Sequence, residues 1–364
     1  MHRIRVKLKR TCDDSYDIFV GNGILDRLNT IGKILDDADR CVIVSDSIVG
    51  PLYGNRVAQN LSAGGLSVDM IEIPAGEASK AISVVLDVAR RLAALKASRK
   101  TLLVALGGGV VGDLAGFVAS TYMRSIPYVQ IATSLIAQVD SSVGGKTGVD
   151  IPEGKNLIGT FYQPKAVFID LSLLKTLPDK DLRNGLAEII KYAIISDEAI
   201  FGVLERDKAL VMKRDPGVMK DLISRCCEIK ADIVQKDEKE GGLRRILNFG
   251  HTLGHALEAG SHYTLTHGEA IAIGMIAAAR ISCRLGHLKN KSCARIEDLV
   301  RNYGLPTRFP AELNTGQILA HMAADKKAVG SRIHFVLIKD IARPFVTGDV
   351  PKEMITDVVD ALRR

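Results

Sequence analysis

Short apolar runs alternate with amphipathic stretches along the first half of the chain. Residues 41–46 (CVIVSD) and 101–106 (TLLVAL) are rich in aliphatic side chains and end in a polar or glycine turn, a pattern typical of buried parallel strands. Residues 128–134 and 165–171 supply two further strands, and residues 79–96 have the periodicity of a helix. This alternation predicts an α/β fold with a parallel sheet.

The pattern changes near residue 175. Helical periodicity dominates afterwards, in residues 177–195, 221–240, 246–275 and 293–304, with a hairpin-like stretch at 332–339. A chain of 364 residues with 47% hydrophobic content is long enough for two domains. We therefore predict an α/β domain over residues 1–175 and a mainly α-helical domain over residues 176–364.

Composition narrows the classes of function. The net charge of +7 is not accompanied by a nucleic-acid motif or by aromatic residues spaced through a basic stripe, so it favours a small anionic substrate over nucleic acid. The six cysteines show no framework spacing, which indicates reduced thiols and a cytoplasmic location. The longest apolar runs, such as residues 271–279, are too short to span a membrane.

A glycine-rich turn follows the strand at 101–106 and opens a helix. Gly107, Gly109 and Gly112 satisfy the G-x-G-x-x-G pattern of dinucleotide-binding turns, in which the backbone approaches a pyrophosphate at a helix N-terminus. The usual acid at the end of the next strand is missing, so Asp46, at the end of the earlier strand, is the candidate for a ribose hydroxyl. A tight turn without a ligand is the alternative.

Residues 137–159 form a polar, glycine-rich run that we predict to be a loop. Asp140, Lys146, Lys155 and Asn156 lie in it, and spaced lysines among backbone donors suit a phosphate cradle. The run is not a Walker A loop, because Asp140 stands where the first glycine belongs, so a kinase or ATPase is disfavoured. A solvated loop without a ligand is the alternative.

Half of the eight histidines lie in residues 246–275. His251 and His255 are four residues apart on one helix face, which makes this pair the simplest candidate for two metal ligands, and His267 can return to the same point after a loop. Structural histidines are the alternative.

Glu188 lies among apolar residues in another predicted helix. A carboxylate in such surroundings needs a partner. The sequence leaves open whether that partner is Lys191, Tyr192 or a metal ion.

Taken together, these segments resemble the 3-dehydroquinate synthase family, within the sugar-phosphate cyclases. The resemblance covers nearly the whole chain in the expected order and is carried by residues 107–124 (GGGVVGDLAGFVASTYMR), 138–147 (QVDSSVGGKT), 154–159 (GKNLIG), 184–194 (NGLAEIIKYAI), 237–258 (DEKEGGLRRILNFGHTLGHALE) and 267–275 (HGEAIAIGM). It implies a Rossmann-like NAD-binding domain, a helical metal-binding domain, an active site between them, and a homodimer.

The resemblance also implies a reaction and its cofactors. The family converts 3-deoxy-D-arabino-heptulosonate 7-phosphate into 3-dehydroquinate and phosphate, a step of the shikimate pathway. Oxidation by NAD, elimination of phosphate, re-reduction and aldol closure follow one another, so NAD is regenerated. A divalent metal, Zn²⁺ or Co²⁺, polarises the substrate.

Site residues follow from the resemblance residue by residue. The implied metal ligands are Glu188, His251 and His267, which makes His255 a catalytic histidine instead of a ligand. The implied substrate pocket contains Asp140, Lys146, Asn156, Lys191, Lys230, Glu240, Arg244 and Asn248. Within it, Lys146, Asn156 and Lys326 hold phosphate, with Lys327 as the alternative to Lys326. Arg244 holds carboxylate, and Arg124 reaches the phosphate in the partner subunit.

The implied NAD site uses residues of both strand ends and turns: Asp46, Glu77, Lys80, Gly108, Gly109, Asp113, Thr133, Ser134, Asp140, Lys146, Lys155, Thr176 and Leu177. Two positions depart from the family pattern, since Ser125 replaces a usual glycine and Ser134 a usual threonine.

Three alternatives remain at this point. Another sugar-phosphate cyclase is disfavoured by Arg244 with Asn248, which suit a substrate carboxylate. A metal-dependent polyol dehydrogenase is disfavoured by Lys146, Asn156 and Lys326, because a polyol carries no phosphate. A non-catalytic NAD-binding module is disfavoured because so many ionisable groups between two domains would cost desolvation free energy without serving a function.

Overall fold

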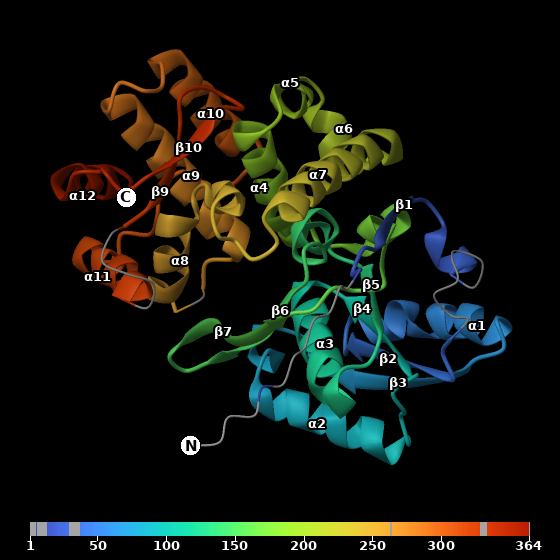
Figure 1. The fold of residues 1–364 in the computed structure, drawn as a ribbon. Helices are drawn as coiled ribbons and strands as arrows, with labels where there is room; N and C mark the ends of the chain where they lie inside the picture. Colours follow the sequence, from blue (N-terminus) through green and yellow to red (C-terminus); the bar gives the residue numbers. More distant parts are fainter. Residues whose placement is uncertain (1–4, 6–12, 29–36, 263, 328–332, 364) are drawn as a thin grey trace, which may run out of the picture.

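The chain folds into a sheet-containing half and a helical half that lie against each other (Figure 1). The computed structural model describes residues 5, 13–28, 37–262, 264–327 and 333–363. Both halves are visible as separate colour ranges in Figure 1, blue to green for the sheet and yellow-green to red for the helices.

A six-stranded parallel sheet forms the centre of the first half. Its strands are β1 (Asp17–Gly21), β2 (Arg40–Asp46), β3 (Ser67–Ile73), β4 (Leu102–Gly107), β5 (Tyr128–Ala132) and β8 (Ala166–Asp170), in the order β1-β8-β5-β4-β2-β3. The four strands predicted from apolar runs are confirmed as β2, β4, β5 and β8. The strands β1 and β3 were not predicted.

Helices cover both faces of this sheet. They are α1 (Asn55–Ala63), α2 (Ile82–Ala94) and α3 (Gly109–Thr121). Successive side chains of a strand point to opposite faces. Accordingly, Cys41 and Ile43 of β2 share a core with α1, whereas Val42 and Val44 share a core with α2 and α3.

The strand order reverses between β2 and β4. From β2 the chain continues to β3 at one edge, and from β4 it continues to β5 and β8 on the other side. Ser45 lies opposite Leu106 in the register, so the strand ends at Asp46 and Gly107 are neighbours. Such a reversal is where doubly wound sheets bind ligands, at the carboxyl ends of the strands.

The predicted loop at residues 137–159 is wrong in its second part. Residues 137–141 form a single helical turn, and β6 (Lys146–Ile151) and β7 (Gly154–Phe161) form an antiparallel hairpin. Gly148 and Gly159 pair across it so closely that a Cβ at Gly159 would lie 2.3 Å from the Thr147 carbonyl oxygen. The glycines that suggested a loop are therefore needed for close strand pairing.

The second half is mainly helical, as predicted. Its elements are α4 (Asp179–Ile195), α5 (Glu198–Arg206), α6 (Lys208–Met212), α7 (Pro216–Lys236), α8 (His251–Gly260), α9 (His267–Arg284), α10 (Asn290–Asn302), α11 (Thr315–Lys327), α12 (Lys352–Ala361), and the antiparallel pair β9 (Phe335–Ile338) and β10 (Pro344–Thr347). The histidine-rich pattern at 246–275 spans two helices, α8 and α9, and His267 is the first residue of the second, in agreement with the loop predicted before it.

The predicted fold class is confirmed: an α/β half with a parallel sheet precedes a mainly helical half. The last sheet strand ends at Asp170 and α4 begins at Asp179. The domain boundary at residue 175 lies between these points and stays a prediction.

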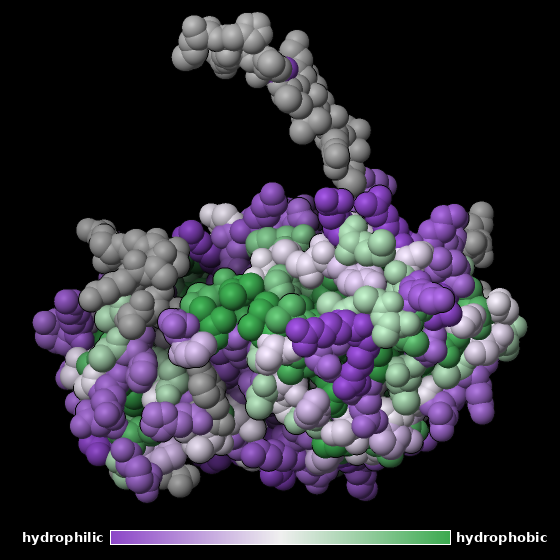
Figure 2. Space-filling model, turned by 90° about the horizontal axis from the view of Figure 1, so that it is seen from below, coloured by the Kyte–Doolittle hydropathy of each residue, from purple (hydrophilic) through white to green (hydrophobic). Residues whose placement is uncertain are grey.

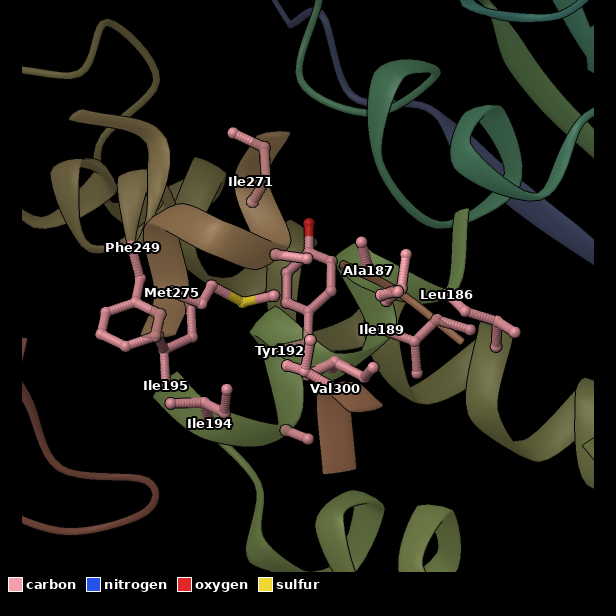
Figure 3. Close-up of a cluster of buried hydrophobic side chains, with 14 of the residues drawn as sticks. Leu186, Ala187, Ile189, Tyr192, Ile194, Ile195, Phe249, Ile271, Met275 and Val300 are labelled. Atoms are coloured by element: carbon pink, nitrogen blue, oxygen red, sulfur yellow. The ribbon is translucent and has the colours of Figure 1, made fainter. Parts of the chain in front are cut away.

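One hydrophobic core joins the two halves. Figure 3 shows Tyr192 and Ile189 of α4 packed among Ile271, Met275 and other buried side chains of the helical half. Val167 and Ile169 of β8 belong to the same core. Of the helices in the described residues, none is both long and apolar enough to cross a membrane.

Candidate active site

The two helices that carry the histidines, α8 and α9, pack so closely that their backbones are in contact. A Cβ at Gly274 of α9 would lie 1.9 Å from the carbonyl oxygen of Gly250, and a Cβ at Gly254 of α8 would lie 2.5 Å from Ile271. Gly250 has a φ of +80°, which favours glycine, and it precedes the first residue of α8. Glycine therefore fixes where His251 stands relative to α9.

Glu188, His251 and His267 lie together. Oε1 of Glu188 is 3.3 Å from Nε2 of His267 and 3.7 Å from Nε2 of His251. The Glu188 side chain is fully buried, and that of His251 is 12% exposed. Nδ1–H of His251 donates to the Phe249 carbonyl at 3.1 Å, which directs Nε2 toward Glu188. Three predicted metal ligands from three helices thus share one point.

The surroundings of Glu188 suit a cation. Its Oε2 forms an ion pair with the Lys191 ammonium. Within the described residues, however, this buried oxygen accepts no hydrogen bond of good geometry. Of the partners left open by the sequence, Lys191 is the one present, whereas the Tyr192 hydroxyl donates to Asp140 at 2.7 Å. One carboxylate and two imidazoles, with donor atoms within 4.8 Å of one another, fit a divalent metal such as zinc or cobalt.

Burial and charge set the protonation of this group. Burial opposes ionisation of Glu188, but the Lys191 ammonium outweighs it and lowers the pKa of Glu188 to about 2. Burial, with Lys191 nearby, lowers the pKa of His251 to about 3, so its imidazole is neutral. Burial also lowers the pKa of His267, but the hydrogen bonds that its ring N–H groups donate to Glu188 and to a second carboxylate outweigh burial and raise the pKa to about 9.

Asp140 lies next to this group, and its carboxylate is approached by two ammonium groups and one hydroxyl. Lys230 on α7 contacts its Oδ1 at 2.8 Å, Lys191 approaches it at 3.9 Å, and Tyr192 donates to it. Burial raises the pKa of Asp140, but the Lys230 and Lys191 ammonium groups outweigh this and hold it well below its usual value. Burial lowers the pKa of Lys230.

A second polar group lies between the hairpin and the segment before α8. The Lys146 ammonium contacts the Glu240 carboxylate, and Asn248 donates to Glu240 at 2.6 Å. Arg244 is 2% exposed and donates to the Gly144 carbonyl at 3.2 Å and to a second carbonyl of its own loop. Four predicted substrate residues are therefore in contact or close in the chain.

The glycine turn lies at the reversal of the strand order. Among the residues that the structure describes, no side chain caps the N-terminus of α3, which leaves its backbone N–H groups available. A Cβ at Gly108 would lie 3.1 Å from the Ser134 hydroxyl, and Thr133 N–H donates to the Gly107 carbonyl at 3.0 Å. Gly108, Gly109, Thr133 and Ser134, predicted as nucleotide contacts, therefore lie close together after the ends of β4 and β5.

Three ion pairs, made by two lysines, connect the surroundings of this turn. Lys80 pairs with Asp113 of α3 at 2.6 Å. Lys155 of β7 pairs with Glu77 at 3.1 Å and with Glu258 of α8 at 3.3 Å. Through Lys155, residues predicted for the nucleotide reach the helices that carry the histidines.

The remaining predicted nucleotide residues lie at other strand ends. Asp46 accepts from the backbone N–H groups of Ile48 and Val49, both at 2.9 Å. Thr176 and Leu177 follow β8, where the Thr176 hydroxyl contacts Tyr53.

Four predicted residues lie outside these groups or at their edge. Asn156 is exposed on the hairpin, Arg124 is exposed on a turn with a φ of 67°, and His255 is exposed on α8 in edge contact with His251, with ring centroids 5.3 Å apart. Lys326 lies on α11, and its side chain, like that of Lys327, falls outside the described residues.

Two contacts of the site, those of Tyr192 with Asp140 and of Glu258 with His267, were not identified from the sequence. Tyr192 donates to Asp140, a contact between segments 52 residues apart that no local pattern indicates. Glu258 follows His251 by seven residues and His255 by three, so helical periodicity could have placed it on the histidine face.

Comparison with known proteins identifies the family. The N-terminal model of 3-dehydroquinate synthase matches residues 70–184, and the C-terminal model matches residues 185–328. A 3-dehydroquinate synthase of Desulforamulus reducens is 45% identical over 350 residues, covering 95% of this chain and 96% of the relative.

Solved structures of related cyclases have the same fold. The 2-epi-5-epi-valiolone synthase of Streptomyces hygroscopicus, bound to NAD⁺ and Zn²⁺, superposes with a TM-score of 0.89 at 30% identity, over 98% of this chain and 99% of the other. A 2-deoxy-scyllo-inosose synthase bound to carbaglucose-6-phosphate, NAD⁺ and Co²⁺ gives a TM-score of 0.87 at 27% identity, over 94% and 96%. By these matches, the chain is an enzyme of the 3-dehydroquinate synthase family.

Proposed function

We propose that the protein converts 3-deoxy-D-arabino-heptulosonate 7-phosphate into 3-dehydroquinate and phosphate. The observation that carries the proposal is the junction of Glu188, His251 and His267 with the buried charges of Lys191, Lys230 and Asp140. A metal-binding group beside fixed ammonium groups suits a reaction that first oxidises an alcohol and then expels an anion.

NAD and a divalent metal, Zn²⁺ or Co²⁺, are the proposed cofactors. The uncapped start of α3, with Gly108 and Gly109, leaves space and donors for a pyrophosphate, and Asp46 lies at the neighbouring strand end. Glu188, His251 and His267 would hold the metal, which when bound supplies Lewis acidity. The related cyclases named above, which were solved with NAD⁺ and Zn²⁺ or Co²⁺, support both assignments.

Different polar residues are assigned to the phosphate and to the carboxylate of the substrate. Lys146 is half exposed and paired with Glu240, so its ammonium is within reach of an incoming phosphate. Asn156 and Lys326 are assigned to the same phosphate. Arg244, held by two carbonyls of the protein, is assigned to the carboxylate, for which its planar fork is suited.

Proton transfer is assigned to His255. Its ring is exposed at the edge of the histidine group and is not among the three proposed ligands, so it can exchange protons with substrate and water. Tyr192 and Lys230 fix the Asp140 carboxylate from two sides, which keeps it ionised and oriented.

We also propose a cytoplasmic homodimer in which Arg124 acts in the partner's site. Figure 2 shows one face of the molecule, with an apolar area framed by hydrophilic side chains. Leu157, Ile158 and Phe161 of the hairpin are exposed at 59%, 37% and 45%, the kind of surface that favours protein contact. Sedimentation equilibrium should give twice the mass of the chain, and a monomer at micromolar concentration would contradict the dimer.

Phosphate release tests the proposed reaction. With the heptulosonate phosphate and a catalytic amount of NAD, phosphate and 3-dehydroquinate should appear in equal amounts while NADH does not accumulate. A chelator should stop both, and added Zn²⁺ or Co²⁺ should restore them. Stoichiometric NADH from a polyol would indicate a dehydrogenase instead. Turnover of a sugar phosphate that lacks a carboxylate, without turnover of the heptulosonate, would indicate another cyclase.

A further inference from the structure

The two histidines of the proposed metal group are oriented by different means. Each presents Nε2 to Oε1 of Glu188 and has its other ring nitrogen, Nδ1, held from behind. For His251 the holder is the backbone carbonyl of Phe249. For His267 it is the carboxylate of Glu258, whose Oε2 lies 3.4 Å from Nδ1. The second arrangement depends on one side chain.

Glu258 is built into the structure as a buried anion. It is 3% exposed, and both of its carboxylate oxygens are used. Oε2 accepts from His267, while Oε1 contacts the Lys155 ammonium at 3.3 Å. Since a buried carboxylate without partners is strongly unfavourable, these two contacts explain how it is tolerated. Neither contact involves Glu188, so Glu258 lies outside the three proposed ligands.

The contact between Glu258 and Nδ1 of His267 affects which ring nitrogen can bind a metal. A neutral imidazole carries one N–H and one lone pair, and whichever nitrogen donates a hydrogen bond leaves the other as the acceptor. In the metal-free protein the ring of His267 lies between two carboxylates, which only accept, so each of them can accept from one ring N–H. A bound metal would replace the proton on Nε2; Glu258 would then keep the remaining proton on Nδ1, and the lone pair of Nε2 would face the point shared with Glu188 and His251. Groups that hold a ligating histidine in this way commonly raise metal affinity.

We infer that Glu258 is a positioning residue, which selects the tautomer and the ring orientation of His267 and thereby sets the metal affinity of the protein. The inference rests on the proposed metal site at Glu188, His251 and His267. Lys155 anchors Glu258 from the hairpin and also pairs with Glu77, so the orientation of His267 is tied to the half of the molecule that carries the glycine turn.

The test compares two substitutions of Glu258 in the metal-free protein. Glu258→Met has a similar volume but no acceptor, and Glu258→Gln keeps one acceptor oxygen. Titration with Co²⁺, followed by its visible absorption and by competition with a chelator, should show an affinity about 10–100-fold lower for Glu258→Met and a smaller loss for Glu258→Gln. Unchanged affinity in Glu258→Met would overturn the inference.

Two controls separate this outcome from simpler ones. Glu297→Met removes another partly buried carboxylate of the same half, paired with Arg280 at 2.7 Å, and should lower thermal stability without changing Co²⁺ affinity. His267→Ala should abolish Co²⁺ binding. If His267→Ala binds Co²⁺ normally, the metal site itself is wrong; if it does not bind while Glu258→Met binds normally, only the positioning role is wrong.

The histidine proton provides a direct readout. In the zinc-loaded protein with ¹⁵N-labelled histidine, His267 should show a protected Nδ1–H that is lost in Glu258→Met and retained in Glu258→Gln. A merely structural role would not move this signal. His255, Glu258 and His267 also form a second group of donors within 4.8 Å of one another. Two bound ions per chain in the parent protein would make Glu258 a ligand and contradict the inference.

Discussion

The glycine turn and the histidine group are built in opposite ways. At the turn, backbone atoms of α3 and of the strand ends form the surface, and a Cβ at Gly107 would lie 2.6 Å from Val111. In the histidine group, buried side chains with opposite charges face one another around Glu188 and Asp140. The turn therefore depends on the absence of side chains, and the histidine group depends on the balance of their charges.

Removing one charge from the helical half should have the largest effect on stability. Lys191→Met leaves Glu188 and Asp140 buried with less compensation, so the free energy of unfolding of the metal-free protein should fall by about 3–5 kcal/mol in urea denaturation. Lys236→Met is the control, because its pair with Asp232 is exposed at 58% and 60%, and it should lose less than about 1 kcal/mol. Equal losses would mean that buried charge balance does not stabilise this half.

Adding one methyl group to the turn should affect the ligand more than the fold. A Cβ at Gly109 would lie 3.1 Å from the Ser141 hydroxyl, a contact that a small shift relieves, so stability should change by less than about 1 kcal/mol. The same methyl group stands where the backbone would approach a pyrophosphate, so NAD affinity in Gly109→Ala should fall by about tenfold or more. Calorimetric titration with NAD measures this, and unchanged affinity would place the nucleotide elsewhere.

The sheet half also contains a strained position. Ser125 has a φ of 102°, a conformation that favours glycine, and it follows Met123 and Arg124, which also have positive φ values. Ser125→Gly should raise the free energy of unfolding by about 1 kcal/mol. Ser62→Gly on the exposed face of α1 is the matched control and should lower it by about 0.5 kcal/mol. A loss of stability in both variants would contradict the strain at Ser125.

The smallest expected effect concerns a charge away from the site. Burial acts against ionisation of Asp197, but hydrogen bonds from Arg225 and from the first N–H groups of α5 lower its pKa. A lowered pKa in the folded state stabilises above the pKa of the unfolded chain, near 4, and the effect disappears as pH falls through the folded value. Asp197→Asn should therefore lose about 0.5–1 kcal/mol at neutral pH and progressively less in acid. A difference that does not depend on pH would contradict this.

The two regions also differ in what the sequence could predict. The strands that flank the glycine turn are apolar runs, and the turn is a contiguous motif, so local pattern placed Asp46, Gly107 and Gly109 at neighbouring strand ends. The hairpin after it was missed, because its glycines, such as Gly148 and Gly159, permit close strand pairing but look like a loop.

The composition of the histidine group could not be predicted from local sequence patterns. Spacing on one helix indicated His251 with His255, whereas the choice of Glu188 and His267 came from the family resemblance. The structure brings Glu188 to these histidines from a helix that ends more than 50 residues earlier in the chain. Contacts such as Tyr192 with Asp140 and Glu258 with His267 depend on how separate segments pack together. A short stretch of sequence carries no information about this packing.

Metal content and turnover of two histidine variants test the central claim most directly. His267→Ala should be purified without bound metal and without activity, because it removes a proposed ligand. His255→Ala should keep the metal content of the parent and lose about 10²–10⁴-fold in the rate of phosphate release, the usual contribution of a general acid–base group. A metal-depleted His255→Ala together with a metal-replete His267→Ala would contradict the assignment of ligand and catalyst.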